Sequence, residues 1–186
     1  MRGFHPLIQD RNGAAAIEFA LILPLLLILS LGMFEIAGVI SADMKLANAT
    51  QLVSDLVAQQ SNETDSLTAN FCTGGEMAMA PLSGTSLKAT VVSVTHDSGG
   101  TAVDWQDTSC GGSDISNAVS LAASVTPNVG DSVIIVVTNY QYTSPLDYVL
   151  SKNYTLTQTS FSRPRNVATV THSLRNGGFT CVRSGF

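Results

Sequence analysis

The chain has 186 residues, 45% of them hydrophobic, and a formal net charge of -5. A chain of this length holds about one globular domain beside a membrane segment, which disfavours a two-domain enzyme. Acidic residues outnumber basic ones between Leu46 and Ser162, and such a surface repels phosphate backbones, so we expect no nucleic-acid partner.

Residues 1–13 form a short polar leader. It carries Arg2, Arg11 and a free amine against one acid, Asp10. Positive charge beside an apolar segment is typical of the cytoplasmic side of a membrane. We therefore expect the N-terminus in the cytoplasm and the domain after the apolar segment, residues 41–186, outside it.

Residues 14–40 are predicted to form a transmembrane helix. The run from Phe19 to Phe34 contains no charged residue and spans about 24 Å as a helix. Its extension to Ile40 covers the ~30 Å hydrocarbon core, with Glu18 and Glu35 near the two edges. Pro24 removes one hydrogen bond inside this helix and is expected to bend it.

Two simpler interpretations of this segment are open on hydropathy alone. A secretory signal peptide needs a small-x-small cleavage site, and the plausible one, Ala47-Asn48-Ala49, lies well beyond the apolar run. This distance argues against a signal peptide. A plain, unprocessed single-span anchor fits the hydropathy well.

The junction between leader and helix favours a third interpretation. Glu18 puts a carboxylate at the rim of an apolar helix, which costs ~2.5–3.5 kcal/mol at the bilayer centre and less near the edge, so it needs a partner. A cut after Gly13 would supply one, because the new amine of Ala14 lies one helical turn away. The amine of a neighbouring subunit would serve equally well, and the carboxylate would then favour one register during assembly.

This junction resembles a class III signal, and RNGAAAIEFALILPLLLILSLGMFEIAGVI resembles the N-terminal segment of the TadE-like family of Tad pilus proteins. The resemblance implies cleavage between Gly13 and Ala14 by a prepilin peptidase, a role for Glu18 in assembly, and an aromatic, Phe19, that completes the motif. The major pilin of such systems usually has Tyr in place of Phe19 and is much shorter. This chain therefore resembles the minor pseudopilins, with a weaker likeness at 140–142 and 162–165.

Beyond the membrane, the helix is predicted to continue to about residue 59. Leu46, Ala49, Val53 and Leu56 follow a helical spacing, while the polar residues fall largely elsewhere. We expect this outer half to lay an apolar stripe on a sheet.

The rest of the chain reads as strands joined by polar segments. Residues 61–84 are rich in Ser, Thr, Gly and Asn and are predicted to be a loop. Short helices are expected after Asp114 and at Ser144-Pro145. Strands are expected at 87–95, 101–106, 132–142 and 154–161, with a further edge at 167–171. The expected fold is α+β, with the long N-terminal helix packed on a mostly antiparallel sheet of about four strands.

Three cysteines, Cys72, Cys110 and Cys181, show no metal-binding or C-x-x-C spacing. In an exported domain, one disulfide and one free thiol form the simplest arrangement. Cys72 with Cys110 is the preferred pair because both lie in Gly-rich and Thr/Ser-rich sequence. Other pairings stay open.

No catalytic residue, cofactor or metal site is predicted. The sequence contains no nucleotide-binding or hydrolase motif, and Trp105 is interpreted as a core anchor. His96 and His172 are interpreted as surface or strand-end residues. An exported enzyme would be favoured if both histidines met an acidic residue in one cleft.

The sequence thus predicts a minor pseudopilin of a Tad (type IVc) pilus, not an enzyme, needed for pilus assembly and surface adherence. It would span the bacterial inner membrane once, with its C-terminal domain in the periplasm, and enter the pilus. The resemblance implies as partners a prepilin peptidase, other pseudopilins and the major pilin, an inner-membrane platform and a cytoplasmic ATPase, while the apolar helix implies the lipid bilayer. The alternative is an unprocessed, membrane-anchored periplasmic binding module or adhesin.

Overall fold

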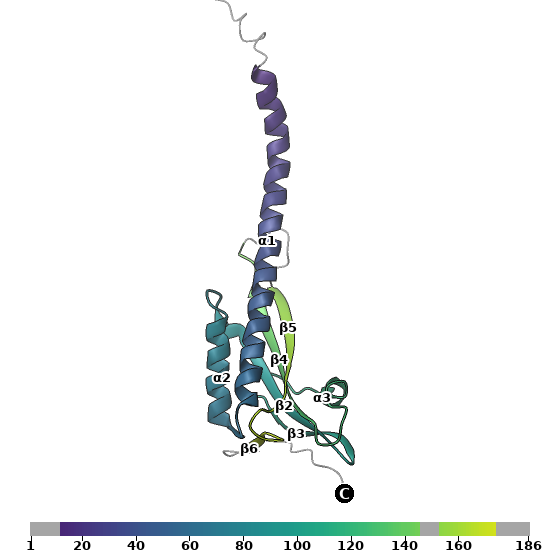
Figure 1. Cartoon of the computed structure of the whole chain (residues 1–186). Helices are drawn as coiled ribbons and strands as arrows, with labels where there is room; N and C mark the ends of the chain where they lie inside the picture. Colours follow the sequence, from purple (N-terminus) through teal and green to yellow (C-terminus); the bar gives the residue numbers. More distant parts are fainter. Residues whose placement is uncertain (1–11, 146–152, 174–186) are drawn as a thin grey trace, which may run out of the picture.

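The computed structural model describes residues 12–145 and 153–173. It begins with one long helix, α1 (Asn12–Ala58), whose 47 residues extend over about 70 Å. The first part of α1 protrudes from the body, and the second part packs on a sheet (Figure 1). The helix runs through Pro24 without interruption, because a single missing hydrogen bond is tolerated where the surrounding residues are strong helix formers.

The sheet has the strand order β3-β2-β4-β5, and all neighbouring strands are antiparallel. The predicted α+β fold, a long helix on an antiparallel sheet of four strands, is confirmed. Strands β2 and β4 are buried on both faces, which explains why their sequences are rich in β-branched residues and only partly alternating. The strands are β2 (Leu87–Asp97), β3 (Gly100–Asp107), β4 (Ser132–Thr143) and β5 (Asn153–Ser162).

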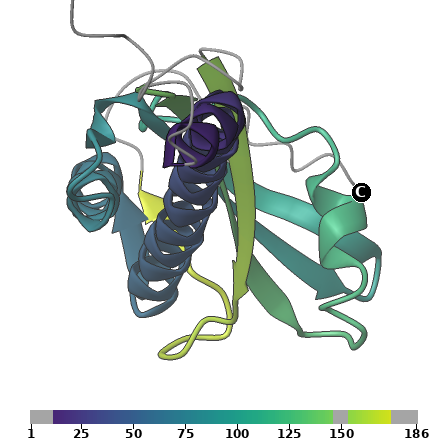
Figure 2. The same cartoon turned by 90° about the horizontal axis from the view of Figure 1, so that it is seen from above.

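Helices cover both faces of the sheet. Helices α1 and α2 (Asp65–Ala78) lie on one face, and the short α3 (Ala118–Ala122) lies on the other (Figure 2). A 3₁₀ turn, η2 (Gly84–Ser86), leads from the α2 region into β2. The core therefore consists of two layers of apolar side chains, one under α1 and one under α3.

The packed half of α1 presents an apolar stripe to the sheet. Ala42, Leu46, Ala49, Val53 and Val57 are all buried there. Three of the four residues predicted for this stripe belong to it. The fourth, Leu56, is only half-buried, because the stripe continues from Val53 by a step of four residues to Val57.

Polar residues of α1 form a second line of contact, with strand β5. The side chain of Gln158 donates to Asp43 (2.8 Å), that of Ser160 to Gln51 (2.7 Å) and that of Ser162 to Asp55 (2.9 Å). These α1 residues were predicted to lie off the apolar stripe, which they do. They nevertheless contact the sheet, because β5 lies beside the stripe and offers its own polar side chains.

The predicted loop at 61–84 is wrong, since α2 occupies most of it. The side chain of Thr64 caps the helix by accepting the amide N–H of Leu67 (3.4 Å). Thr68 and Gly75 face inward, and Phe71 packs against the core cluster that contains Val53. Tertiary packing thus outweighs the weak helix propensity of a Thr-, Asn- and Gly-rich sequence.

A small second sheet closes the far end of the body. Strands β1 (Asn62–Thr64) and β6 (Thr171–Ser173) pair in parallel, with Glu63 opposite His172. The further edge predicted at 167–171 is therefore wrong in position, since β6 shares only Thr171 with that range. Helix α3 begins after Asn117 and not at Asp114, whose carboxylate accepts the side-chain N–H of Gln106 (2.7 Å). The helical turn predicted from Ser144-Pro145 falls mostly on residues outside the described ranges, and Cys181 lies outside them entirely.

Candidate functional site

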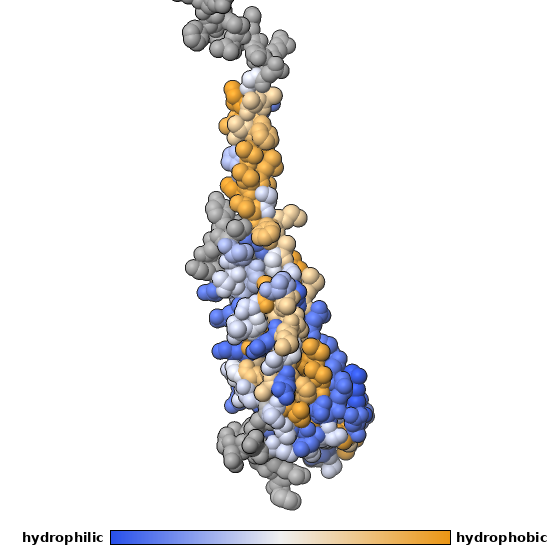
Figure 3. All heavy atoms as spheres, turned by 90° about the vertical axis from the view of Figure 1, so that its left-hand side faces the viewer, coloured by the Kyte–Doolittle hydropathy of each residue, from blue (hydrophilic) through white to orange (hydrophobic). Residues whose placement is uncertain are grey.

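The protruding half of α1 is the most distinctive surface of the molecule. Every residue from Gly13 to Leu31 is exposed, and this stretch covers about 28 Å, close to the ~30 Å of a hydrocarbon core. Its surface is almost continuously apolar, in contrast to the mixed body (Figure 3). Among the described residues, α1 is the one helix long and apolar enough to cross a membrane, and the body buries none of its most apolar part. We call residues 13–31 the bare segment.

The residues singled out at the junction lie together at the tip of the bare segment. Gly13 is the second residue of α1, and a Cβ added there would meet no atom within 4 Å. Ala14 and Glu18 are exposed and one turn apart, so they share one face of the helix. Phe19 is 60% exposed. An exposed carboxylate thus lies within one turn of the peptide bond between Gly13 and Ala14.

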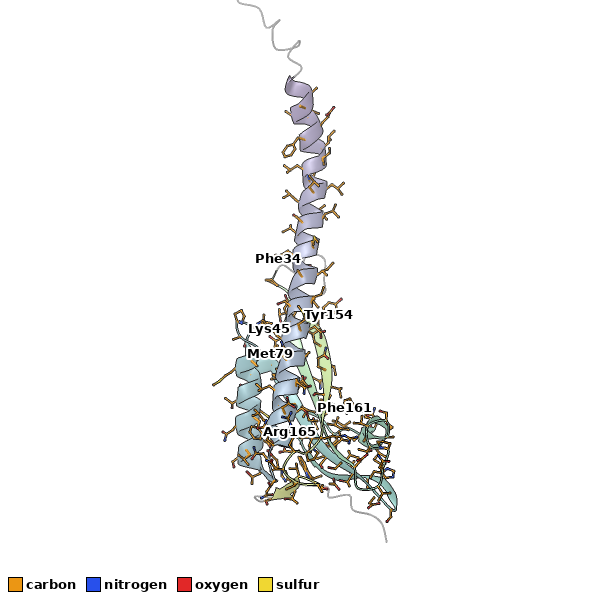
Figure 4. The ribbon with its side chains drawn as sticks, in the orientation of Figure 1. Phe34, Lys45, Met79, Tyr154, Phe161 and Arg165 are labelled. Atoms are coloured by element: carbon orange, nitrogen blue, oxygen red, sulfur yellow. A yellow bond between two sulfur atoms is a disulfide. The ribbon has the colours of Figure 1, made fainter. Side chains whose placement is uncertain are left out.

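The bare segment ends where α1 meets the end of β4. Glu35 is only 1% exposed, and the hydroxyl of Ser144 donates to its carboxylate (3.3 Å). Gly38 follows, where a Cβ would lie 2.5 Å from the phenol oxygen of Tyr142, so glycine allows this ring to lie close to the helix. Phe34, the residue before Glu35, is exposed and lies above the packed body (Figure 4). We call this contact of α1 with the end of β4 the collar.

A lysine links α1 to the end of α2. The ammonium group of Lys45 donates to the backbone carbonyl of Ala80 (2.6 Å), near Met79 (Figure 4). Further along α1, Arg165 lies beside the last turn, where its guanidinium pairs with Asp55 (3.2 Å) and its backbone N–H donates to the carbonyl of Ala58 (2.9 Å). These contacts hold the packed half of α1 near its middle and at its last turn.

Cys72 on α2 and Cys110 after β3 form a disulfide, with their Cα atoms 6.1 Å apart. This separation is ordinary for a disulfide. The bond joins α2 to the loop after β3. A cavity of about 240 Å³ lies beside it, between α2, β2 and the loop after β3. Among the described residues that line it, Glu76 is the one ionisable side chain, so they bring together no acid and base.

A buried group of ionisable side chains lies elsewhere, between β1, β3 and β6. The side chain of His172 is 2% exposed, and its Nε2 lies 3.4 Å from a carboxylate oxygen of Asp107. Glu63 is fully buried, and its carboxylate accepts the hydroxyl of Thr68 (2.7 Å). His172 was expected at the surface or at the end of a strand; it does lie in the short strand β6, but its side chain is not at the surface. The reason is that pairing of β6 with β1 turns this residue inward.

The two carboxylates of this group have opposite pKa shifts. Burial raises the pKa of Glu63 from 4.5 to about 7, against smaller opposing effects of the Thr68 hydrogen bond and of His172. Burial also acts to raise the pKa of Asp107, but the nearby His172, the N–H of Ser109 and the hydroxyl of Thr68 outweigh it and lower the pKa to about 2. The backbone N–H of Ser109 donates to Asp107 at 2.7 Å.

His96 does not join this group. Its ring nitrogen is 2.8 Å from the hydroxyl of Thr101 at the turn of the β2–β3 hairpin, whereas Asp107 lies at the other end of that hairpin. The two histidines and an acid therefore do not share one cleft. In the described part of the chain, no three His, Cys, Asp or Glu residues are placed to hold a metal ion. The core role predicted for Trp105 is confirmed, since its ring packs with Val53 and Val170.

The described part of the chain thus combines an α+β body with one long apolar helix that suggests a single-pass membrane anchor. Comparison with protein families gives the second step: residues 13–53 match the TadE-like protein family, whose members are structural pseudopilins associated with Tad pili. The resemblance stated from the sequence is confirmed over this segment, which includes the bare segment and most of the packed half of α1. Comparisons with curated proteins and with solved structures found no match.

Proposed function

We propose that this protein is a minor pseudopilin of a Tad pilus and not an enzyme. A prepilin peptidase cuts it after Gly13, and the processed chain is then assembled through α1. The proposal rests on one observation: the segment that matches the TadE-like family carries, at its exposed tip, a carboxylate one turn from the expected cut. Residues 1–13 are then a cytoplasmic leader, 14–40 the transmembrane helix and 41–186 a periplasmic domain.

The position of the cut suits proteolysis. The first four N–H groups of a helix have no partner within it, so the first turn is the easiest part of α1 to unwind. Gly13 lies in that turn and has no side chain to protect the bond that follows it. Cleavage gives Ala14 a free amine, which is largely protonated at neutral pH.

The new amine gives Glu18 a partner of opposite charge. Within one chain, the two groups are a helical turn apart, about 6 Å along the axis. A neighbouring chain that packs its own bare segment alongside presents the same amine to Glu18. Because a carboxylate in an apolar layer is costly until it is paired, subunits that are out of register are disfavoured.

The body is proposed to provide the contacts outside the membrane. Its partners would be the other pseudopilins and the major pilin, with the inner-membrane platform and the cytoplasmic ATPase acting on the helix end. The collar supports this division of labour, because it fixes the body at the point where the bare segment ends. Assembly and surface adherence would then require both halves of α1.

Intact mass of the chain extracted from bacterial membranes tests the proposal. We expect loss of residues 1–13 and a chain that begins at Ala14. A Gly13→Val variant should keep the leader, because the enlarged side chain at the cut blocks the peptidase. Its matched control, Ala16→Ser, lies three residues further along the exposed helix and should be cut normally.

A wild-type chain that keeps Met1, or begins anywhere other than Ala14, would contradict the pseudopilin proposal. It would favour the alternative, an unprocessed membrane-anchored binding module or adhesin.

A further inference from the structure

The buried acid–histidine group lies at the end of the body far from the bare segment and has no part in the proposed assembly through α1. Its ionisable members are Glu63 on β1, Asp107 on β3 and His172 on β6, and their side chains are between 0% and 2% exposed. Burial of a charge is costly unless partners compensate for it. Three such groups at one place therefore make the local structure sensitive to their protonation.

These side chains hold the last described segment of the chain against the body. Glu63 and His172 are opposite each other in the β1–β6 pair. The indole N–H of Trp105 donates to the carbonyl of Val170 (2.7 Å), and its ring lies 5.0 Å from that of His172. The remaining polar contacts of β6, such as that of Ser173 with Asn62, are exposed and contribute little. The attachment of β6 thus depends on the buried group.

The two carboxylates have unequal support. One oxygen of Asp107 accepts the Ser109 N–H, and the other faces His172, so this carboxylate is stabilised as an anion. One oxygen of Glu63 accepts the Thr68 hydroxyl, while its other oxygen is buried without a hydrogen-bond partner among the described residues. The charged groups that act on Glu63 are His172, which is attractive, and Asp107, which is repulsive. The surroundings of Glu63 therefore favour its neutral, protonated form.

We propose that Glu63, Asp107 and His172 form a proton-dependent latch. While Glu63 carries its proton, β6 stays paired with β1. When Glu63 loses the proton, a second buried negative charge lies close to Asp107, and β6 is released from the body. Residues 174–186, whose sequence includes Arg175 and Arg183, follow β6 directly, so the latch controls the point at which they join the body.

The direction of the pH dependence follows from the raised pKa of Glu63. Its value is about 7 in the closed state and 4.5 once the group is exposed. Closure is therefore fully favoured below pH 4.5 and is weakened as the pH rises to 7. Over this range the opening equilibrium constant increases up to about tenfold per pH unit, and above pH 7 it levels off.

Hydrogen exchange of the full-length chain in detergent micelles tests the latch. The opening constant is measured from pH 5 to 8.5 in peptides that cover 59–64 and 165–173, after correction for the intrinsic exchange rate at each pH. Peptides from β4 serve as an internal reference. We expect the opening constant to rise to pH 7 and then level off in the first two regions, with no such rise in β4.

Glu63→Gln should abolish this rise, because the amide has a similar shape and does not titrate. The matched control is Glu76→Gln, the same chemical change on the exposed side of α2, which should behave like the wild type. If Glu63→Gln does not fold, the pH dependence of exchange in the wild type tests the latch by itself. A rise confined to 59–64 and 165–173 supports the latch, and a uniform rise that includes β4 overturns it.

A rise that persists unchanged in Glu63→Gln, or no rise in the wild type, also overturns the latch. A second readout is the fluorescence of Trp105, the only tryptophan in the chain. Its accessibility to acrylamide should increase together with exchange in 165–173. None of these outcomes depends on cleavage after Gly13.

Discussion

Glu18 is exposed on the bare segment, although its surroundings there are almost entirely apolar. In water this carboxylate would need no special account. In a membrane or a bundle of apolar helices, burial of this unpaired charge would be costly. The charged residues of the leader, such as Arg11, could not pair with it after cleavage. A role of Glu18 in assembly can therefore be tested separately from cleavage after Gly13.

Replacement of Glu18 by Gln should leave cleavage intact and strongly reduce incorporation into pili. The amide keeps the shape of the side chain but cannot form an ion pair with the amine of a neighbouring subunit. Processing is followed by intact mass, and incorporation by the amount of the protein in sheared surface fractions.

Two further variants serve as controls for Glu18. Glu18→Asp keeps the charge and should retain part of the function. Ser30→Ala removes the other polar side chain of the bare segment, whose hydroxyl donates only to the carbonyl of Leu27, and should assemble normally. Wild-type incorporation of Glu18→Gln would remove the register role.

The site at the tip of α1 can be predicted from the sequence, whereas the latch cannot. Gly13, Glu18 and Phe19 form a local motif, so their spacing alone indicates a site. Glu63, Asp107 and His172 are far apart in the chain, and only the β1–β6 pairing brings them together. The only local feature is Glu63, an acidic residue within the polar stretch 61–84. Such a residue is typical of a solvated loop and does not indicate a buried site.

Among the elements, strands β2 to β5 and the continuation of α1 are predictable, because their apolar residues follow a clear period over many positions. Helix α2 is not. It has few large apolar residues and contains two adjacent glycines, Gly74 and Gly75, so its stability comes from contacts with α1, from the Thr64 cap and from the disulfide at Cys72. Long-range contacts of this kind leave no periodic signal.

The two glycines of α2 provide a matched pair of substitutions. Gly74→Ala should stabilise the body by about 0.5–1 kcal/mol, since alanine favours the helix and its methyl group meets no atom within 4 Å. Gly75→Ala should gain less or destabilise, because its methyl group would lie 3.1 Å from Val53 and 3.3 Å from Leu87. Denaturant unfolding of both variants measures the difference.

The same stabilisation by both alanines would mean that α2 does not pack on α1 and β2 as closely as described.

At the scale of the whole molecule, the opposite pKa shifts of Glu63 and Asp107 restrict maximal stability to mildly acidic pH. For Asp107, the pKa is about 2 in the folded state and 3.8 in the unfolded state. The stability that it contributes, on the order of 2 kcal/mol, is present above pH 3.8 and is lost as the pH falls to 2. The raised pKa of Glu63 has the opposite effect: the stability that its protonated form contributes is lost as the pH rises from 4.5 to about 7.

We therefore expect the free energy of unfolding to be highest near pH 4–5 and to decline toward pH 2. Asp107→Asn should be less stable at pH 5 and should show a smaller decline below pH 4 than the wild type, since its side chain does not titrate. Urea unfolding at fixed pH values measures both effects. If the free energy of unfolding of Asp107→Asn declines below pH 4 as much as that of the wild type, other carboxyl groups cause the decline.

Because α1 continues without a break from the bare segment into the body, a pull on its tip acts along the helix axis. The packed half of α1 lies lengthwise on the sheet and is held at its far end by Arg165. Such a load shears the whole interface at once and does not peel it open one contact at a time. The body should accordingly resist traction along α1 better than force applied across it, which makes the molecule mechanically anisotropic.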